Sequence, residues 1–324
     1  MRSFKLIITI VACVAGVIAL GFFGFWLYNR HLSNNYPNLD SNNPESNFFM
    51  AAKGQLQIYP TRNWKISDPD VKAQIFSVSD IDNDFIYLEK NPNSRRPIAS
   101  LTKLMTSLVA EKNIAPTSEV TITDNALSTD GDKGYGLIAN EIFNSRDLIK
   151  LMLLVSSNKA AYALADTVGY DDFIRLMNEE AKNLNMTQTS FNDSSGLSML
   201  NQSTAEDLKR LTRYIVKEYP AIFIATQEQN ATIFSVDNKV KHVLTNIDQI
   251  SLEPKFLKEL GIKYLGGKTG FTDEAKETFL GLFSIPNTKD PGQSKRILVI
   301  VLSSDSRYND VESLLRWLKS AYVF

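Results

Sequence analysis

Residues 97–106 read PIASLTKLMT and place a serine and a lysine three positions apart. Apolar side chains recur at spacings of three and four through residues 100–111, which predicts a helix there. On that helix Ser100 and Lys103 share one face, a turn apart. The positive end of the helix dipole beside Ser100 favours an alkoxide and, later, an acyl oxyanion. The pattern indicates either a serine nucleophile with a lysine base or an ordinary helix start.

The composition of the chain leaves few alternatives to lysine as the base. The two histidines are His31 and His242, so a Ser-His-Asp triad would depend on His242 alone, and a zinc site would lack most of its usual ligands. We therefore expect no metal and no other cofactor. Lys103 accepts a proton only when it is neutral. Desolvation and a second cation, for which Lys268 is the candidate, would lower its pKa in that direction.

Two more short motifs follow along the chain. Ser156-Ser157-Asn158 lies between predicted helical segments, and Lys268-Thr269-Gly270 ends a predicted strand. S-x-x-K alone is weakly specific, because it occurs again from Ser156 to Lys159. The order S-x-x-K, S-x-N, K-T-G occurs in penicillin-binding proteins and class A β-lactamases. The three motifs in this order are far more specific than any one of them.

On these residues the sequence resembles the serine D-alanyl-D-alanine carboxypeptidase family, the low-molecular-mass penicillin-binding proteins. The similarity runs over about residues 73–317, and includes residues 151–166 (LMLLVSSNKAAYALAD) and residues 267–272 (GKTGFT). The resemblance implies an α+β fold of the β-lactamase and penicillin-binding-protein type, in which helices flank an antiparallel sheet and form an inserted helical lobe. It also implies peptidoglycan stem peptides as substrates and β-lactam antibiotics as covalent inhibitors.

The resemblance assigns roles to the residues of the first two motifs. Ser100 would be the acylated nucleophile and Lys103 its base. Ser156 would pass the proton to the leaving amine, and Asn158 would hold the substrate's amide.

The third motif would bind the substrate. Lys268 would supply positive charge near the substrate carboxylate, and Thr269 would donate a hydrogen bond to that carboxylate. Gly270 would let the substrate lie along the strand edge. The backbone N–H groups of Ser100 and Phe271 would form the oxyanion hole. Arg307 is a weaker candidate for binding the carboxylate, since it could equally be a surface arginine at the start of the last helix.

Two positions depart from the family pattern and leave substrate preference open. Lys159 follows Asn158 where an acidic residue is common, and Lys276 stands where a glycine is usual. The run DSSGL also resembles a family turn, in which we expect Ser194 and Ser195 to be structural.

Hydrophobic periodicity predicts strands near both ends of the domain and helices between them, hence an antiparallel sheet built from the two ends of the chain. Residues 203–206 have the spacing of a capping box between Ser203 and Glu206. The predicted helices are residues 100–111, 146–168, 172–184, 204–217 and 310–321, and the predicted strands are residues 73–78, 85–89, 233–236, 240–244, 262–268, 278–285 and 296–302.

The N-terminal region predicts a membrane anchor. Residues 6–28 carry no charged side chain and are long enough to cross a hydrocarbon core of roughly 30 Å, whereas a cleaved signal peptide, the less favoured alternative, has a shorter apolar run. Residues 32–54 are rich in Asn, Ser and Pro and predict a flexible stem. The expected division is an anchor with its flanks at residues 1–31, the stem at 32–54 and one catalytic domain at 55–324.

Flanking charges decide the orientation of this helix only weakly. We expect a single-pass protein of the cell membrane with its catalytic domain outside the cytoplasm, where peptidoglycan occurs. The 35 basic and 36 acidic residues nearly cancel, so no nucleic-acid partner is expected.

These expectations combine into a membrane-anchored carboxypeptidase that removes the terminal D-alanine of stem peptides through an acyl-enzyme on Ser100. A DD-endopeptidase that cleaves peptidoglycan cross-links uses the same chemistry and remains the close alternative. A β-lactamase would need a glutamate to activate the deacylating water, and no E-x-x-x-N match lies in a loop-like setting after the second motif. A catalytically silent wall-binding protein would have no need of all the motif residues.

Overall fold

The computed structural model describes residues 48–50, 56–58, 60–131, 135–237, 239–287 and 293–324. The chain divides into two compact units, Met1–Tyr59 and Pro60–Phe324. In the first unit β1 (Phe48–Met50) pairs antiparallel with β2 (Leu56–Ile58). The predicted membrane segment at residues 6–28 and most of the predicted stem lie outside the described residues. Among the helices that are described, none is both long and apolar enough to span a bilayer.

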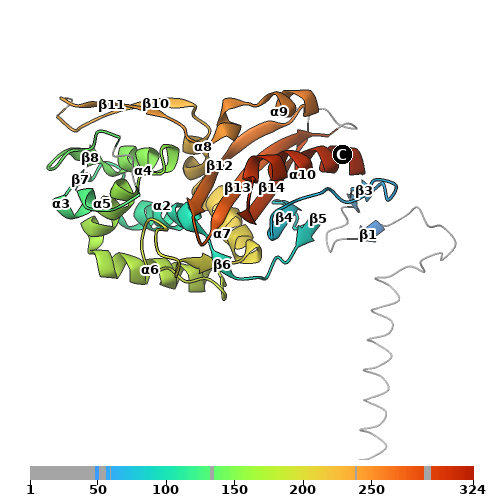
Figure 1. Cartoon of the computed structure of the whole chain (residues 1–324), viewed down its shortest axis with the longest axis horizontal. Coiled ribbons are helices and arrows are strands. Elements are labelled where there is room, and N and C mark those ends of the chain that lie inside the picture. Colours follow the sequence, from blue (N-terminus) through green and yellow to red (C-terminus); the bar gives the residue numbers. More distant parts are fainter. Residues whose placement is uncertain (1–47, 51–55, 59, 132–134, 238, 288–292) are drawn as a thin grey trace, which may run out of the picture. The chain divides into compact units, whose positions relative to one another are not determined.

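The second unit contains a five-stranded antiparallel sheet made from both ends of the chain, as predicted (Figure 1). Its order is β12-β13-β14-β4-β5, so β12 pairs with β13 alone and forms an outer strand of the sheet. The central strand β14 carries the apolar run ILVIVL, which suits a strand covered on both faces. The strands are β4 (Ile75–Asp80), β5 (Ile86–Lys90), β12 (Lys263–Thr272), β13 (Lys276–Pro286) and β14 (Ser294–Ser304).

Alternation along the strands divides the core into two layers. On β13, Phe279 and Phe283 point to the face covered by α10 (Arg307–Ala321) and α9 (Lys255–Leu260). Leu280 and Leu282 point to the opposite face, where the helical lobe packs. Because successive side chains of a strand alternate between faces, one strand supplies both layers of the core.

The middle of the chain forms the helical lobe. The predicted helix at residues 146–168 is broken, because Ser156 has a left-handed backbone (φ 58°) and the Ser157 hydroxyl caps a new helix by accepting a bond of 3.1 Å from Ala160 N. The helices of the lobe are α2 (Thr102–Asn113), α3 (Asp124–Leu127), α4 (Ser145–Leu154), α5 (Asn158–Val168), α6 (Tyr170–Asn183), α7 (Ala205–Glu218) and α8 (Ala221–Thr226).

The predicted capping box of α7 is wrong by one residue. The cap is Thr204, whose hydroxyl accepts a bond of 3.0 Å from Asp207 N. Ser203 instead belongs to strand β9 (Gln202–Ser203), and its hydroxyl lies 2.7 Å from that of Thr189. A polar residue on either side of a helix start fits the same sequence pattern, so only the strand pairing of Ser203 decides between them.

The predicted strands at residues 233–236 and 240–244 do not join the main sheet. They form a separate antiparallel hairpin, β10 (Asn230–Phe234) and β11 (Lys241–Thr245), which lies over the helical lobe beside α4 and β8 (Figure 1). One face of the hairpin is buried and the other exposed, so it packs as a cover on the lobe. The remaining short elements are β3 (Thr61–Arg62), β6 (Arg96–Pro97), β7 (Glu119–Thr121), β8 (Ile142–Asn144), β9 (Gln202–Ser203), β15 (Tyr322–Val323), η1 (Ala99–Leu101) and η2 (Gln249–Leu252).

Candidate active site

Ser100 and Lys103 lie where the helical lobe meets the sheet. Ser100 is in the 3-10 turn η1, one turn before the buried Lys103 on α2, and Lys103 Nζ donates a hydrogen bond of 2.9 Å to Ser100 Oγ. The regular helix therefore begins at Thr102 and not at Ser100 as predicted. Ala99 has a left-handed backbone (φ 48°), and a Cβ on Gly196 would lie only 2.0 Å from the Ala99 carbonyl oxygen. Glycine at position 196 thus allows its loop to pack directly against the backbone of Ala99 and Ser100.

The Lys103 amine has two further acceptors. Its Nζ atom donates bonds of 2.7 Å to Asn158 Oδ1 and 2.6 Å to the Ser195 carbonyl oxygen. Asn158 Nδ2 in turn donates to the Asp130 carbonyl oxygen at 2.9 Å. Because these bonds fix both the amine and the amide, Lys103 and Asn158 face Ser100 in a defined geometry. The predicted structural role of Ser195 therefore includes contact with the candidate base, through the backbone.

The second serine is paired with the lysine of the third motif. Lys268 Nζ donates bonds of 2.9 Å to Ser156 Oγ and 2.7 Å to the Thr269 carbonyl oxygen. Burial, followed by the nearby charge of Lys103, lowers the pKa of Lys268 well below its ordinary value, with Asp248 opposing the shift and Arg307 adding to it. The two lysines of the predicted site therefore repel each other electrostatically inside the protein.

The outer strand β12 passes directly beside the nucleophile. A Cβ on Gly270 would lie 2.7 Å from Ser100 N and 3.0 Å from the Ala99 side chain, so only glycine lets the strand approach this closely. Thr269 and Phe271 flank Gly270 along the strand edge, and the Phe271 side chain is 58% exposed. Residues 269–272 of this edge line the cavity beside Ser100.

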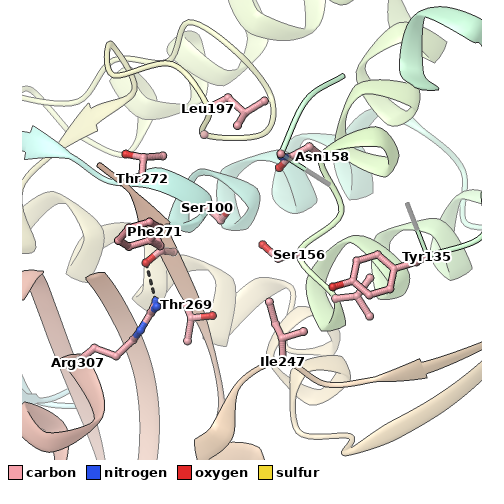
Figure 2. A pocket seen from close by; sticks show the side chains of 14 residues that line it. Ser100, Tyr135, Ser156, Asn158, Leu197, Ile247, Thr269, Phe271, Thr272 and Arg307 are labelled. Atoms are coloured by element: carbon pink, nitrogen blue, oxygen red, sulfur yellow. Dashed lines mark hydrogen bonds between the residues drawn. The ribbon is translucent and has the colours of Figure 1, made fainter. Parts of the chain in front are cut away.

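Arg307 begins α10 and lines the same cavity. Its Nη1 atom donates to the carbonyl oxygens of Gly270 at 2.6 Å and Thr278 at 3.0 Å, and its Nε atom lies 3.4 Å from Glu277 Oε2. These contacts support the strand from below, so part of the guanidinium is committed to the backbone (Figure 2).

One cavity of about 380 Å³ joins these groups. Ser100, Ser156, Asn158 and Thr269 point into it from four segments (Figure 2). Several residues of its lining were assigned no role from the sequence, although Val155, Thr272 and the DSSGL turn lie in runs that resemble the family. The missed lining residues are Gly131, Tyr135, Val155, Gly196, Leu197, Ile247 and Thr272.

The two departures from the family pattern lie outside the lining of this cavity. Lys159 Nζ donates to the Leu127 carbonyl oxygen. Lys276 has a left-handed backbone (φ 59°) at the start of β13 and lies 3.9 Å from Asp305. A left-handed conformation explains why glycine is usual there.

No histidine takes part in this arrangement within the part of the chain that the structure describes. His242 lies in β11, where its ring nitrogens contact Glu141 and the Tyr135 carbonyl oxygen. A triad between His242 and Ser100 is therefore not formed. The described residues also contain no cluster of His, Cys, Asp and Glu suited to a metal ion.

Comparison with known proteins agrees with this geometry. The chain is 28% identical to the D-alanyl-D-alanine endopeptidase of Escherichia coli (strain K12) over 79% of this chain and 80% of the relative. It is 28% identical to the D-alanyl-D-alanine carboxypeptidase DacA of Haemophilus influenzae over 78% of this chain and 63% of that protein. The ampicillin-bound structure of penicillin-binding protein D2 from Listeria monocytogenes is 28% identical and superimposes with a TM-score of 0.63, covering 78% of this chain and 98% of that one.

The profile of the D-alanyl-D-alanine carboxypeptidase family matches residues 63–303, which is most of the second unit. The α+β fold, with its sheet built from both chain ends and its helical lobe, is the fold of the similar penicillin-binding proteins. The chain belongs to the D-alanyl-D-alanine carboxypeptidase family.

Proposed function

We propose that this protein is a serine D-alanyl-D-alanine carboxypeptidase that removes the terminal D-alanine from peptidoglycan stem peptides. The observation that carries the proposal is a pair of hydroxyl–amine contacts, Lys103 with Ser100 and Lys268 with Ser156, both at 2.9 Å. The two hydroxyls line one cavity, and the two amines are buried behind them. A nucleophile with its base and a second proton carrier face the outer strand β12, where a peptide can lie extended.

Acylation begins when neutral Lys103 takes the Ser100 hydroxyl proton. Ser100 Oγ attacks the carbonyl carbon of the penultimate D-alanine, and the backbone N–H groups of Ser100 and Phe271 bind the oxyanion. The C–N bond then breaks, Ser156 gives its proton to the departing nitrogen, and free D-alanine leaves. The proton held by Lys103 then passes to Ser156, whose oxygen accepts a hydrogen bond from Lys268.

Deacylation uses one water molecule. The water attacks the ester carbonyl of the acyl-enzyme, and its proton passes to the same base that opened the cycle. The ester C–O bond breaks, and Lys103 gives this proton to Ser100 Oγ. The products are the shortened peptide and free enzyme, so no cofactor is consumed.

The carboxylate of the leaving D-alanine would lie against Thr269 and Lys268. A hydroxyl and a cation satisfy a carboxylate by charge-assisted hydrogen bonds, whereas a neutral amide in this place would leave them underused. Arg307 would contribute positive charge from beneath Gly270, because its Nη1 atom is held by two backbone carbonyl oxygens.

A DD-endopeptidase activity on cross-links remains the second candidate. It is favoured by the similarity to relatives named D-alanyl-D-alanine endopeptidases, among them the one from Escherichia coli. Both activities use the same acyl-enzyme and differ in the residue that leaves. A β-lactamase and a catalytically silent wall-binding protein have no comparable support.

Labelled penicillin followed by peptide mapping tests the mechanism, because a β-lactam should acylate the same serine. We expect the label on Ser100. Label on another residue, or none on folded protein, would contradict the assignment. Release of D-alanine from a pentapeptide stem and cleavage of a cross-linked dimer, measured side by side, then separate the two activities, and faster cleavage of the dimer would replace the carboxypeptidase by the endopeptidase.

We also propose that residues 6–28 anchor the protein in the cell membrane, that residues 32–54 form a stem, and that the catalytic domain at residues 55–324 faces outward. The uncharged apolar run and the location of peptidoglycan support this arrangement. Protease added to intact spheroplasts should release the catalytic domain by cutting the stem. Full protection until lysis would refute the outward orientation, and a soluble secreted form beginning after residue 28 would refute the anchor.

A further inference from the structure

His242 is a buried histidine on β11 that the proposed mechanism does not use. Its Nε2 atom lies 2.5 Å from Glu141 Oε1, and its Nδ1 atom lies 3.2 Å from the Tyr135 carbonyl oxygen. The Phe143 ring packs edge-on against it at 5.3 Å, and both side chains of the His242–Glu141 pair are at most 4% exposed. The imidazole therefore connects the β10–β11 hairpin to the segment at residues 135–141.

That segment is strained where His242 holds it. Tyr135 has a left-handed backbone (φ 34°), a conformation unfavourable for an aromatic residue, and Gly136 follows with φ 76°. A Cβ on Gly136 would lie 3.8 Å from His242 Nδ1, so this backbone turns directly over the imidazole. Such a conformation persists only where the surroundings hold it, and the bond from His242 to the Tyr135 carbonyl oxygen is one such restraint.

The restrained residue forms one wall of the active-site cavity. Tyr135 and Ile247 line the cavity together with Ser156, and the Tyr135 phenol oxygen is turned toward Ser156 (Figure 2). Ile247 follows β11 and donates a backbone bond of 3.1 Å to the Leu154 carbonyl oxygen. The hairpin that carries His242 thus leads into a second residue of the same wall.

We propose that His242 is a positioning residue that holds Tyr135 as the wall beside the leaving group, and that this wall restricts the departing D-amino acid to a small side chain. The inference rests on the proposed function. Because Ser156 donates a proton to the leaving amine, the departing residue lies beside Ser156 and therefore against Tyr135 and Ile247. The His242–Glu141 pair acts on specificity through Tyr135 and does not touch the substrate.

Two amide variants separate the two bonds of the imidazole. In His242→Asn the amide nitrogen takes the place of Nδ1 and can donate to the Tyr135 carbonyl oxygen, whereas in His242→Gln it takes the place of Nε2 and keeps contact with Glu141. The substrates are stem peptides ending in D-Ala-D-Ala and in D-Ala-D-Leu. We expect the wild type to prefer the first by at least about tenfold in kcat/KM, the effect of added methylene groups in a confined site.

The preference should fall about tenfold in Tyr135→Ala, which removes the wall, and should fall in His242→Gln, which frees the Tyr135 backbone. His242→Asn should retain it. Val243→Ala is the matched control, because this neighbour of His242 is 67% exposed on the opposite face of the hairpin, and it should keep the wild-type ratio. The changes should appear mainly as a lower KM and a higher kcat for the D-leucine substrate.

An equal change of the substrate preference in His242→Asn and His242→Gln would show that the imidazole has only a structural role and would overturn the inference. An unchanged ratio in Tyr135→Ala would overturn it as well, and this variant remains informative where a His242 variant fails to fold. Labelling of Ser100 by penicillin reports folding of each variant. A wild type that takes no label and releases no D-alanine would contradict the proposed function itself, whereas an active wild type with unchanged variant ratios contradicts only the role of His242.

Discussion

The Nζ atom of Lys268 lies 2.9 Å from the Oγ atom of Ser156, so a strand of the sheet and the break between two helices meet at one hydrogen bond. Lys268 is buried, and its pKa is lowered well below the usual value because of that burial and the charge of Lys103. The site thus holds two amines whose positive charges oppose each other, which favours loss of a proton from the pair.

The charge on Lys268 should make stability depend on pH. Since its folded-state pKa is lowered from 10.5, the folded protein binds fewer protons than the unfolded chain between the lowered pKa and 10.5. The free energy of unfolding of the wild type, relative to Lys268→Met, should therefore rise with pH across that window, by at most about 1.4 kcal/mol per pH unit. Urea denaturation from pH 7 to pH 10 measures it.

Lys255→Met is the control for this titration, since its side chain is 91% exposed and stays in water in both states. The difference in the free energy of unfolding between this variant and the wild type should change less with pH than that of Lys268→Met, because an exposed side chain loses little hydration on folding. An equally small change for Lys268→Met would contradict the lowered pKa of Lys268.

Lys103→Ala should lower the rate of acylation by labelled penicillin by about 10²- to 10⁴-fold, because the base that takes the Ser100 proton is lost. Alanine is a good helix former, so α2 should persist. The matched control is Lys159→Ala in the second S-x-x-K match. Lys159 Nζ bonds the Leu127 carbonyl oxygen outside the cavity lining, and this variant should acylate at the wild-type rate. Equal rates for both variants would remove Lys103 from the mechanism.

Thr269→Val should lower turnover of a pentapeptide stem by about 1–3 kcal/mol in transition-state stabilisation, the cost of an unmet hydrogen bond to a charged group. Thr269 is buried in the cavity wall and valine matches its shape, so folding should be preserved. Steady-state release of D-alanine measures the effect. If Thr269→Val slowed only the cleavage of substrates that lack a free terminal carboxylate, Thr269 would not bind that carboxylate.

Asp193 should support the base through the backbone. Its Oδ1 atom accepts bonds of 2.6 Å from both Ser195 N and Gly196 N, and its Oδ2 atom accepts one of 2.6 Å from Ser198 N. Asp193→Ala leaves these donors unmet and should lower the free energy of unfolding by about 1–3 kcal/mol. It should also slow acylation, because Lys103 loses a fixed acceptor at the Ser195 carbonyl oxygen.

Asp193→Asn serves as the comparison, since it keeps one side-chain oxygen for the first two donors, and its effects should be smaller. Urea denaturation and penicillin labelling measure both quantities. Unaltered acylation in folded Asp193→Ala would show that the turn does not position Lys103.

Lys276→Gly should stabilise the protein. The left-handed conformation of Lys276 (φ 59°) costs a residue with a Cβ about 1–2 kcal/mol, partly offset by the greater freedom of glycine in the unfolded chain. Lys276→Ala keeps the Cβ and loses the same 3.9 Å contact to Asp305, which is worth little because both side chains are exposed. Higher stability in the glycine variant alone is the expected result of urea denaturation, and equal stabilities would exclude backbone strain.

The sequence determined the local parts of this protein. Ser100 and Lys103 had to share a helix face because three residues make nearly one turn, and the apolar runs in β13 and β14 marked strands that are buried on both faces. The resemblance based on the three motifs then indicated which separate segments belong to one site, and the structure brings Ser156, Asn158 and Lys268 to Ser100 and Lys103.

Which other groups reach the cavity depends on contacts between segments far apart in the chain. Ser195 and Asp130 act through backbone carbonyl oxygens, which carry no side-chain signature, and Tyr135 and Ile247 are wall residues without a local motif. The same limit explains the β10–β11 hairpin, whose strand pattern was clear although its partner was not. Periodicity reports the conformation and the buried face of a segment, whereas the surface against which that face packs depends on contacts between residues far apart in the chain.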